Sequence, residues 1–91
     1  MKKYLVYADT IWSGTSNVYP LEVDDSATIY DIDQQALDIA YDNFFSCKSV
    51  YDIAVEEKLD PENLSNLEAC EEKIPQYIMY DFKEFSGTDD D

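Results

Sequence analysis

The sequence predicts a single α+β domain, in which a three-stranded antiparallel sheet carries helices packed on one face. Strand-like runs stand near the two ends of the chain, and a long stretch between them has the apolar spacing of a helix. A chain of 91 residues suits one domain. The predicted element order is β-β-α-α-α-β, with one compact domain over residues 1–85 and a flexible acidic tail over 86–91. We expect the last strand to pair beside the first, because a lone hairpin is not stable by itself.

The first two strands are predicted to form a hairpin with a long loop. Residues 3–8 (KYLVYA) and 18–23 (VYPLEV) are rich in strand-forming residues, and the SGTSN segment between them is a turn signal. Pro20 cannot donate a ladder hydrogen bond, so we expect the second strand at a sheet edge or with a bulge. The candidate inward-facing positions of this strand are Val18, Leu21 and Val23.

A long helix is predicted over residues 28–46, and the rest of the chain is organised around it. Its apolar residues recur at the spacing of one helical face, and a second apolar stripe adjoins this face. Ser26, Thr28 and Asp31 are candidates to cap its first turn. The two stripes comprise Ile29, Ile32, Ala36, Ile39 and Ala40, followed by Leu37, Tyr41 and Phe44.

Two further helices and a strand are predicted after this helix. Ser49 is placed to cap a helix over residues 50–58, although nothing in the FSCKS segment forbids one continuous helix from 28 to 58. The third helix is predicted over 61–73, with Asp60 as cap, Pro61 in the first turn and Pro75 as the stop. Its inward residues would be Leu64, Leu67 and Cys70. The alternating residues 77–85 predict the last strand.

The charge of the chain is its most unusual property. There are 21 acidic residues against 6 lysines, with no arginine or histidine, and the net charge is −15. This exceeds the magnitude of about 2–8 that is usual for a small domain. The acids are spread along the chain and are not gathered in one tail, so we expect an acidic surface of fixed shape. Such a surface attracts a basic cleft by long-range steering, which salt weakens.

Three of these acids line up on the predicted central helix. Asp31, Asp38 and Asp42 are spaced i, i+7 and i+11, which places them on nearly one line away from the apolar face. The line spans roughly 16 Å at 1.5 Å per residue. One interpretation is an ordinary solvated helix face. The alternative is a row of carboxylates in place of DNA phosphates, which follow one another at roughly 3.4 Å per nucleotide along a strand.

The residue types argue against catalysis and against a dedicated metal site. Without histidine or arginine, acid–base and phosphate chemistry lack their most common groups. The Asp31–Asp33 pair lacks the further ligands and the glycine of a calcium loop. We therefore expect no enzyme activity, no catalytic residues, no metal and no cofactor. Cys47 and Cys70 would be reduced thiols, or a disulfide if the chain is secreted.

In size and acidity the whole chain resembles the small acidic anti-defence proteins of bacteriophages. These are the anti-CRISPR and anti-restriction inhibitors, some of which are DNA mimics. The likeness is at the level of the class and includes no family motif, so no functional residues are transferred. It implies a stoichiometric inhibitor that occupies the basic nucleic-acid channel of a bacterial defence nuclease complex.

The expected partner is accordingly a basic protein, such as a nucleic-acid-binding nuclease or a CRISPR effector subunit. We expect no direct binding to nucleic acid or membrane, a monomer or homodimer, and a location in the cytoplasm of a bacterial host cell. Trp12, in a glycine-containing loop, is the candidate for an exposed contact residue, with a place in the core as the open alternative. The candidate partner-binding residues are Asp31, Asp38, Asp42, Glu56, Glu57, Glu68, Glu71, Glu72 and Trp12.

Two alternatives remain open from the sequence. The chain could be an acidic adaptor module that binds a partner through an exposed strand or an aromatic patch, in which case salt would weaken binding little. It could also be a domain adapted to high salt, which would unfold when salt is removed. Eight tyrosines and six lysines argue against that adaptation, because halophilic surfaces tend to carry small residues.

Overall fold

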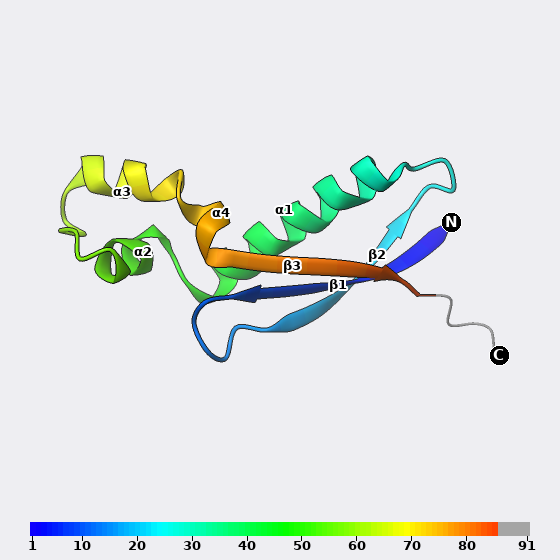
Figure 1. Ribbon diagram of the computed structural model, residues 1–91, viewed down its shortest axis with the longest axis horizontal. Helices are drawn as coiled ribbons and strands as arrows, with labels where there is room; N and C mark the ends of the chain where they lie inside the picture. The colour runs from blue at the N-terminus through cyan, green and yellow to red at the C-terminus, as the bar shows by residue number, and fades with distance from the viewer. Residues whose placement is uncertain (86–91) are drawn as a thin grey trace.

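The computed structural model describes residues 1–85 and confirms the predicted α+β class and element order (Figure 1). The sheet is antiparallel, with the strand order β2-β1-β3, so the last strand does pair beside the first. The predicted tail, residues 86–91, lies outside the described residues. The elements are β1 Lys2–Thr10, β2 Asn17–Val23, α1 Ile29–Cys47, α2 Val50–Glu56, α3 Leu64–Glu71, α4 Ile74–Tyr77 and β3 Ile78–Glu84.

One face of the sheet is covered by α1. Alternate residues of β1 are buried toward the helix, and the register places Val6 between Tyr19 of β2 and Phe82 of β3. On α1, the buried positions Ile32, Ala36 and Ala40 recur every four residues and therefore form one face. The packing of an apolar helix stripe on an apolar sheet face is the layer arrangement that the sequence predicts.

The central helix is separate from the one that follows it. Thr28 caps α1 through a reciprocal pair of bonds with Asp31, in which each residue accepts from the other's backbone N–H. Lys48 is extended, with φ of −140°, and ends the helix. The N–H of Ser49 then donates to Asp52 at 2.9 Å, which stabilises the start of α2. Residues 28–58 therefore form two helices.

The third helix begins later than predicted, because Asp60 and Pro61 belong to a turn. The N–H of Asn63 donates to the carbonyl of Asp60 at 3.1 Å, which closes a four-residue turn with proline at its second position. Asn63 is the actual cap, and it accepts from the N–H of Asn66 at 3.2 Å. Pro75 does not stop a helix either. It lies in the first turn of the short helix α4, where a missing N–H is tolerated.

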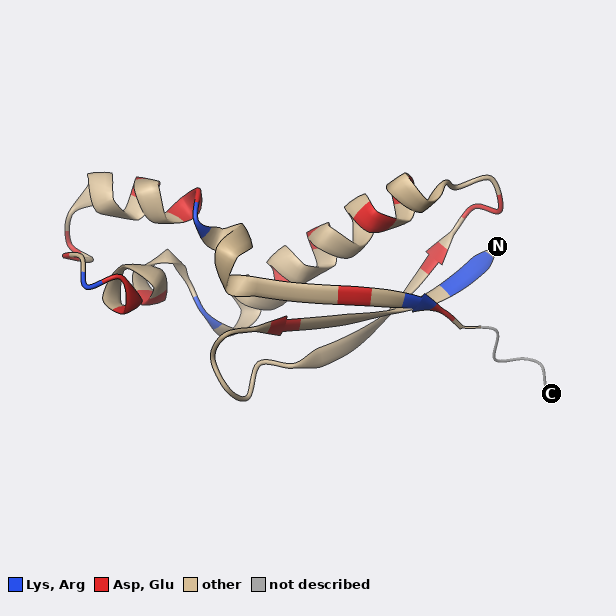
Figure 2. Cartoon of the chain, in the orientation of Figure 1, with Lys and Arg blue, Asp and Glu red and all other residues tan. Residues whose placement is uncertain are grey.

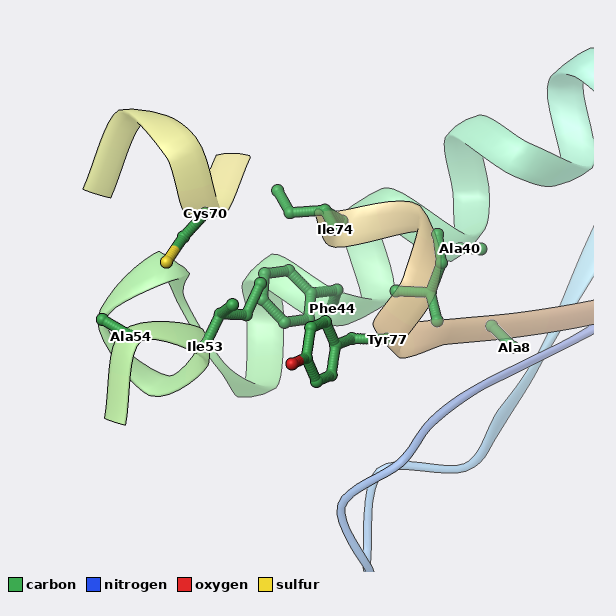
Figure 3. Packing of buried hydrophobic residues seen from close by; sticks show 9 residues of the cluster. Ala8, Ala40, Phe44, Ile53, Ala54, Cys70, Ile74 and Tyr77 are labelled. Carbon is green, nitrogen blue, oxygen red and sulfur yellow. The ribbon is translucent and has the colours of Figure 1, made fainter. Parts of the chain in front are cut away.

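The helices α2, α3 and α4 form a lobe beyond one end of the sheet (Figure 1), and the molecule is elongated, with extents of 52 × 26 × 15 Å. Figure 3 shows how the core continues into this lobe, with Phe44 of α1, Ile53 of α2 and Tyr77 of α4 converging. A second, smaller cluster of Tyr4, Val23 and Ile32 lies under the first half of α1.

Three apolar residues expected to face inward are exposed instead. Val18 is 54% exposed, because the β1–β2 ladder is continuous through Pro20 without a bulge and strand alternation turns Val18 away from α1. Ile29, at the first position of α1, and Leu64, at the first position of α3, are 68% and 70% exposed. Both have the right helical spacing, but each lies at the end of its helix, outside the buried clusters.

A buried asparagine of α1 forms hydrogen bonds with the β1–β2 hairpin. Asn43 is 1% exposed, and its side-chain oxygen accepts from the Asn17 amide and the Tyr19 hydroxyl, both at 2.7 Å. Its side-chain nitrogen donates to the carbonyl of Thr15 at 3.0 Å. A buried side-chain amide with three partners in one segment fixes the height and rotation of the helix over the sheet.

We therefore expect Asn43→Ala to lower the free energy of unfolding by about 2–4 kcal/mol, because it leaves buried polar groups unpaired. Urea denaturation followed by circular dichroism measures this change. Gln35→Ala is the matched control on the exposed side of α1, and it should change stability by less than about 0.5 kcal/mol. Equal stability of the two variants would show that the Asn43 bonds do not hold the helix in place.

Candidate functional site

The three aligned aspartates of α1 lie where the sequence places them, exposed on the side of the helix away from the sheet. We call Asp31, Asp38 and Asp42 the acidic ridge. Asp31 also serves the helix cap, because its carboxylate accepts from the N–H of Thr28 at 3.1 Å. Among the described residues, Asp38 and Asp42 make no hydrogen bond or ion pair through their side chains, so both carboxylates are available to a partner.

An exposed aromatic residue continues the acidic ridge toward the lobe. Phe45 lies three residues after Asp42 and seven after Asp38, which puts it on the same side of α1. Its side chain is 53% exposed and meets the buried ring of Phe44 edge-on, with centroids 5.1 Å apart. The prediction from sequence overlooked Phe45 as a surface residue, although its i+7 spacing from Asp38 was visible.

A fourth aspartate of α1 is used inside the fold. The hydroxyl of Tyr80, on β3, donates to Asp33 at 2.8 Å and so links the helix to the sheet. Partial burial raises the pKa of Tyr80 above its ordinary value of 10.0, and the hydrogen bond to Asp33 and its negative charge raise it further. Asp33 therefore stabilises the packing of α1 on the sheet, whereas the aspartates of the acidic ridge face solvent.

The lobe acids that the sequence predicts to bind a partner also fall into two groups, those that are exposed and one that is paired inside the fold. Glu56 is exposed on α2, Glu68 and Glu71 are exposed on α3, and Glu72 is exposed at the C-cap of α3. Glu57 is instead half-buried, where it pairs with the ammonium of Lys73 at 3.0 Å and accepts a hydrogen bond from the Tyr77 hydroxyl. This pairing joins α2 to α4, so Glu57 supports the lobe and is not free to bind a partner.

Trp12 is half-buried rather than fully exposed. Its ring stacks on Tyr77 with centroids 5.5 Å apart and an interplanar angle of 22°, and it also lies near Phe44 at 6.1 Å. The ammonium of Lys48 lies 5.8 Å from the ring centroid, within the range of a cation–π contact. Most of the Trp12 contacts therefore hold the hairpin loop against the junction with the lobe, and the half-buried ring leaves less surface for a partner.

The negative charge is poorly neutralised within the described part of the chain. Figure 2 shows acidic residues on all three strands and on the helices α1, α2 and α3. Three ion pairs occur in residues 1–85, joining the N-terminus to Asp25, Lys3 to Glu22 and Lys73 to Glu57. The first two pairs are exposed and contribute little stability, whereas the pair of Lys73 with Glu57 is half-buried. The acidic ridge and the exposed lobe acids therefore lie on a surface where negative charge predominates.

The described residues offer little to support other chemistries. No group of three acidic or cysteine side chains is arranged to hold a metal ion in this part of the chain. Cys47 is exposed and Cys70 buried, and both are free thiols. None of the helices among residues 1–85 is long and apolar enough to cross a membrane.

Comparisons with known protein families, curated proteins and solved structures find no match to this chain. Its function is therefore inferred from the shape and charge of its surface.

The contact between Asp33 and Tyr80 has a measurable pH dependence. Because the pKa of Tyr80 is raised in the folded state, its stabilising contribution is complete below pH 10.0 and is lost as the pH rises through the folded pKa. Asp33→Asn should lower the pKa of Tyr80 only part of the way, since burial is the largest cause. NMR titration of the Tyr80 ring carbons measures it.

Asp38→Asn makes the same charge change on the opposite side of α1, and it should leave the pKa of Tyr80 unchanged. An equal effect of the two variants would mean that Tyr80 senses the net charge of the protein and not its bond to Asp33.

Proposed function

We propose that this protein is a non-enzymatic acidic inhibitor that acts in the bacterial cytoplasm. It would bind the basic nucleic-acid-binding surface of a bacterial defence nuclease complex. The observation that carries the proposal is the acidic ridge, whose Asp38 and Asp42 carboxylates are exposed and unpaired among the described residues. The net charge of −15 adds long-range attraction toward a basic partner.

The acidic ridge has the rigidity that a phosphate mimic needs. A capping box stabilises the start of α1, and Asn43 ties its second half to the hairpin. The carboxylates of Asp38 and Asp42 are one helical turn apart, about 6 Å along the axis. This corresponds to a step of about two phosphates at roughly 3.4 Å per nucleotide. A preformed row binds with less loss of conformational entropy than a flexible acidic tail.

The likeness to small acidic phage anti-defence proteins supports a defence nuclease as the class of partner. Such nucleases hold DNA or RNA in positively charged channels, which an anionic surface of fixed shape can enter in place of the nucleic acid. Phe45, next to the acidic ridge, would add apolar contact where the basic surface is lined by the stems of arginine or lysine.

An adaptor that pairs strands with its partner is the second candidate. The strand order leaves β3 at an edge of the sheet, and unlike β2 this strand contains no proline. A free edge of this kind can accept a strand from another protein. Binding through backbone hydrogen bonds would persist at high salt, whereas binding through the acidic ridge would not.

The proposal predicts that the chain restores phage plating on bacteria that carry an RNA-guided or restriction defence system. Expression of the wild-type chain should raise plating efficiency, and the double variant Asp38→Lys/Asp42→Lys should remove this effect. With the purified nuclease complex, wild-type binding should weaken as salt rises, and double-stranded DNA should compete with it.

Glu62→Lys/Glu84→Lys is the matched control, because it makes the same charge change at exposed acids away from the acidic ridge. It should retain most of the activity. Asp31 is left intact, since its replacement would also remove the helix cap. Equal loss in both double variants would leave net charge, and not the acidic ridge, as the determinant. If the chain affects no defence system and competes with no nucleic acid, the proposed function is wrong.

A further inference from the structure

The face of the sheet opposite α1 is uncovered among the described residues and contains an apolar patch, although Lys3, Glu22 and Lys83 lie on the same face. Strand alternation directs the side chains of Leu5 and Tyr7 to this face, and the register places Val18 on one side of Tyr7 and Asp81 on the other. Met79 lies beside them, across from Asp9. We call this surface the open face; its apolar residues are Leu5, Tyr7, Val18, Pro20, Met79 and Phe85.

The composition of β1 differs from that of a strand with one buried face and one solvent-exposed face. Such strands alternate apolar and polar residues, whereas residues 4–8 (YLVYA) are apolar throughout. Tyr4, Val6 and Ala8 face α1. Packing against α1 therefore does not account for the apolar side chains of Leu5 and Tyr7, which lie on the open face. Tyr7, Val18 and Met79 are 39%, 54% and 49% exposed. Adjacent exposed apolar and aromatic residues mark an interaction surface.

The open face contains a hollow of about 550 Å³ that is lined in part by acids. Tyr7, Val18 and Met79 supply its apolar lining, and Asp9 and Asp81 are the charged residues beside them. No lysine is among the residues that line it. The hollow thus combines an aromatic ring with two carboxylates, which is an arrangement that suits a cation with an apolar body.

Both carboxylates are held in place by bonds to the backbone. The N–H of Thr10 donates to Asp9 at 2.7 Å and, with the hydroxyls of Ser16 and Thr15, lowers the pKa of Asp9, so this carboxyl is ionised at neutral pH. The N–H of Phe82 donates to Oδ1 of Asp81 at 2.8 Å. The second oxygen of Asp81 has no partner among the described residues and is free to accept from a ligand.

The negative charge of the chain argues against two possible occupants of the open face, a second copy of the chain and its own segment 86–91. A second copy would bring a further charge of −15 onto a face that already carries Asp9 and Asp81. The segment 86–91 (SGTDDD) has three acids and no large apolar side chain, so its composition does not complement the hollow. Charge complementarity instead favours a cationic group from another protein.

We propose that the open face docks a segment of a partner protein that presents an arginine flanked by apolar side chains. The guanidinium stacks on the ring of Tyr7 and pairs with Asp9 and Asp81, while the flanking side chains pack on Val18 and Met79. Arginine suits this site better than lysine, because its planar head stacks on aromatic rings and pairs bidentately with carboxylates. This site is on the opposite side of the sheet from the acidic ridge and does not depend on it.

A selection of short random peptides against the immobilised full-length chain tests the proposal. Selected peptides should carry an arginine next to aliphatic or aromatic residues. Replacing that arginine by citrulline, a neutral analogue of similar shape, should lower affinity about tenfold or more. Asp9→Asn/Asp81→Asn should have a similar effect and should not disturb the fold, because the amide oxygens still accept from Thr10 and Phe82. Amide NMR shifts on peptide binding should centre on Tyr7, Val18 and Met79.

Asp38→Asn/Asp42→Asn is the matched control and should bind the selected peptides as the wild type does. If this variant loses binding instead, the peptides occupy the acidic ridge, which would favour the proposed function and contradict docking at the open face. Peptides without enrichment in arginine, or no selected peptides, would also overturn the proposal. A dimer in sedimentation that is broken by Tyr7→Ser would show that a second copy covers this face.

Discussion

The burial of Phe44 at the end of α1 is the interaction on which the rest of the structure depends. Phe44 is fully buried, and in Figure 3 it lies among side chains from α2 and α4. Trp12 from the hairpin loop packs beside it. Sheet, central helix and lobe meet at this one ring, whose burial contributes about 1.5–3 kcal/mol by itself. Without this junction the short helices of the lobe could pack only on one another, and isolated helices of this length are unstable in water.

The burial of apolar side chains at this junction offsets the repulsion among the acids, which destabilises the folded state. A net charge of −15 on a small domain repels itself, and the described residues contain few internal cations to compensate. Some acids have partners inside the fold. Asp33 accepts a hydrogen bond from Tyr80, and Glu57 pairs with Lys73 and accepts a hydrogen bond from Tyr77. The acids without such partners raise the energy of the folded state, and a basic partner would relieve that repulsion.

Much of the fold was predictable, because periodicity in long elements is a strong signal. The three strands and α1 follow from strand-forming composition and helical spacing, whereas the break before α2 was left open by the sequence and is settled by the extended Lys48 and the bond from Ser49 to Asp52. The start of α3 was wrong because an aspartate before proline suits both a helix cap and a turn, and the bond from Asn63 to Asp60 favours the turn. Four residues are too few for α4 to show a period at all.

The candidate site was predictable in its charge but not in its contacts. Exposure of Asp38 and Asp42 follows from helical spacing alone. The internal pairing of Glu57 with a lysine 16 residues away depends on how the lobe folds back, which no local pattern reveals. The open face did have a signal, since the unbroken apolar run 4–8 indicates a strand with two apolar faces. Strand-forming composition predicts the strand itself but does not show what each of its faces contacts.

The position of Trp12 gives the molecule an intrinsic optical probe. It is the single tryptophan of the chain, and its indole lies where the hairpin loop, α1 and the lobe meet, stacked on Tyr77 and close to the Lys48 ammonium. Its fluorescence emission therefore depends on whether the lobe is docked against the sheet. Partial opening of this junction would transfer the indole from an aromatic contact to water. Native emission can thus distinguish detachment of the lobe from unfolding of the sheet, without any added label.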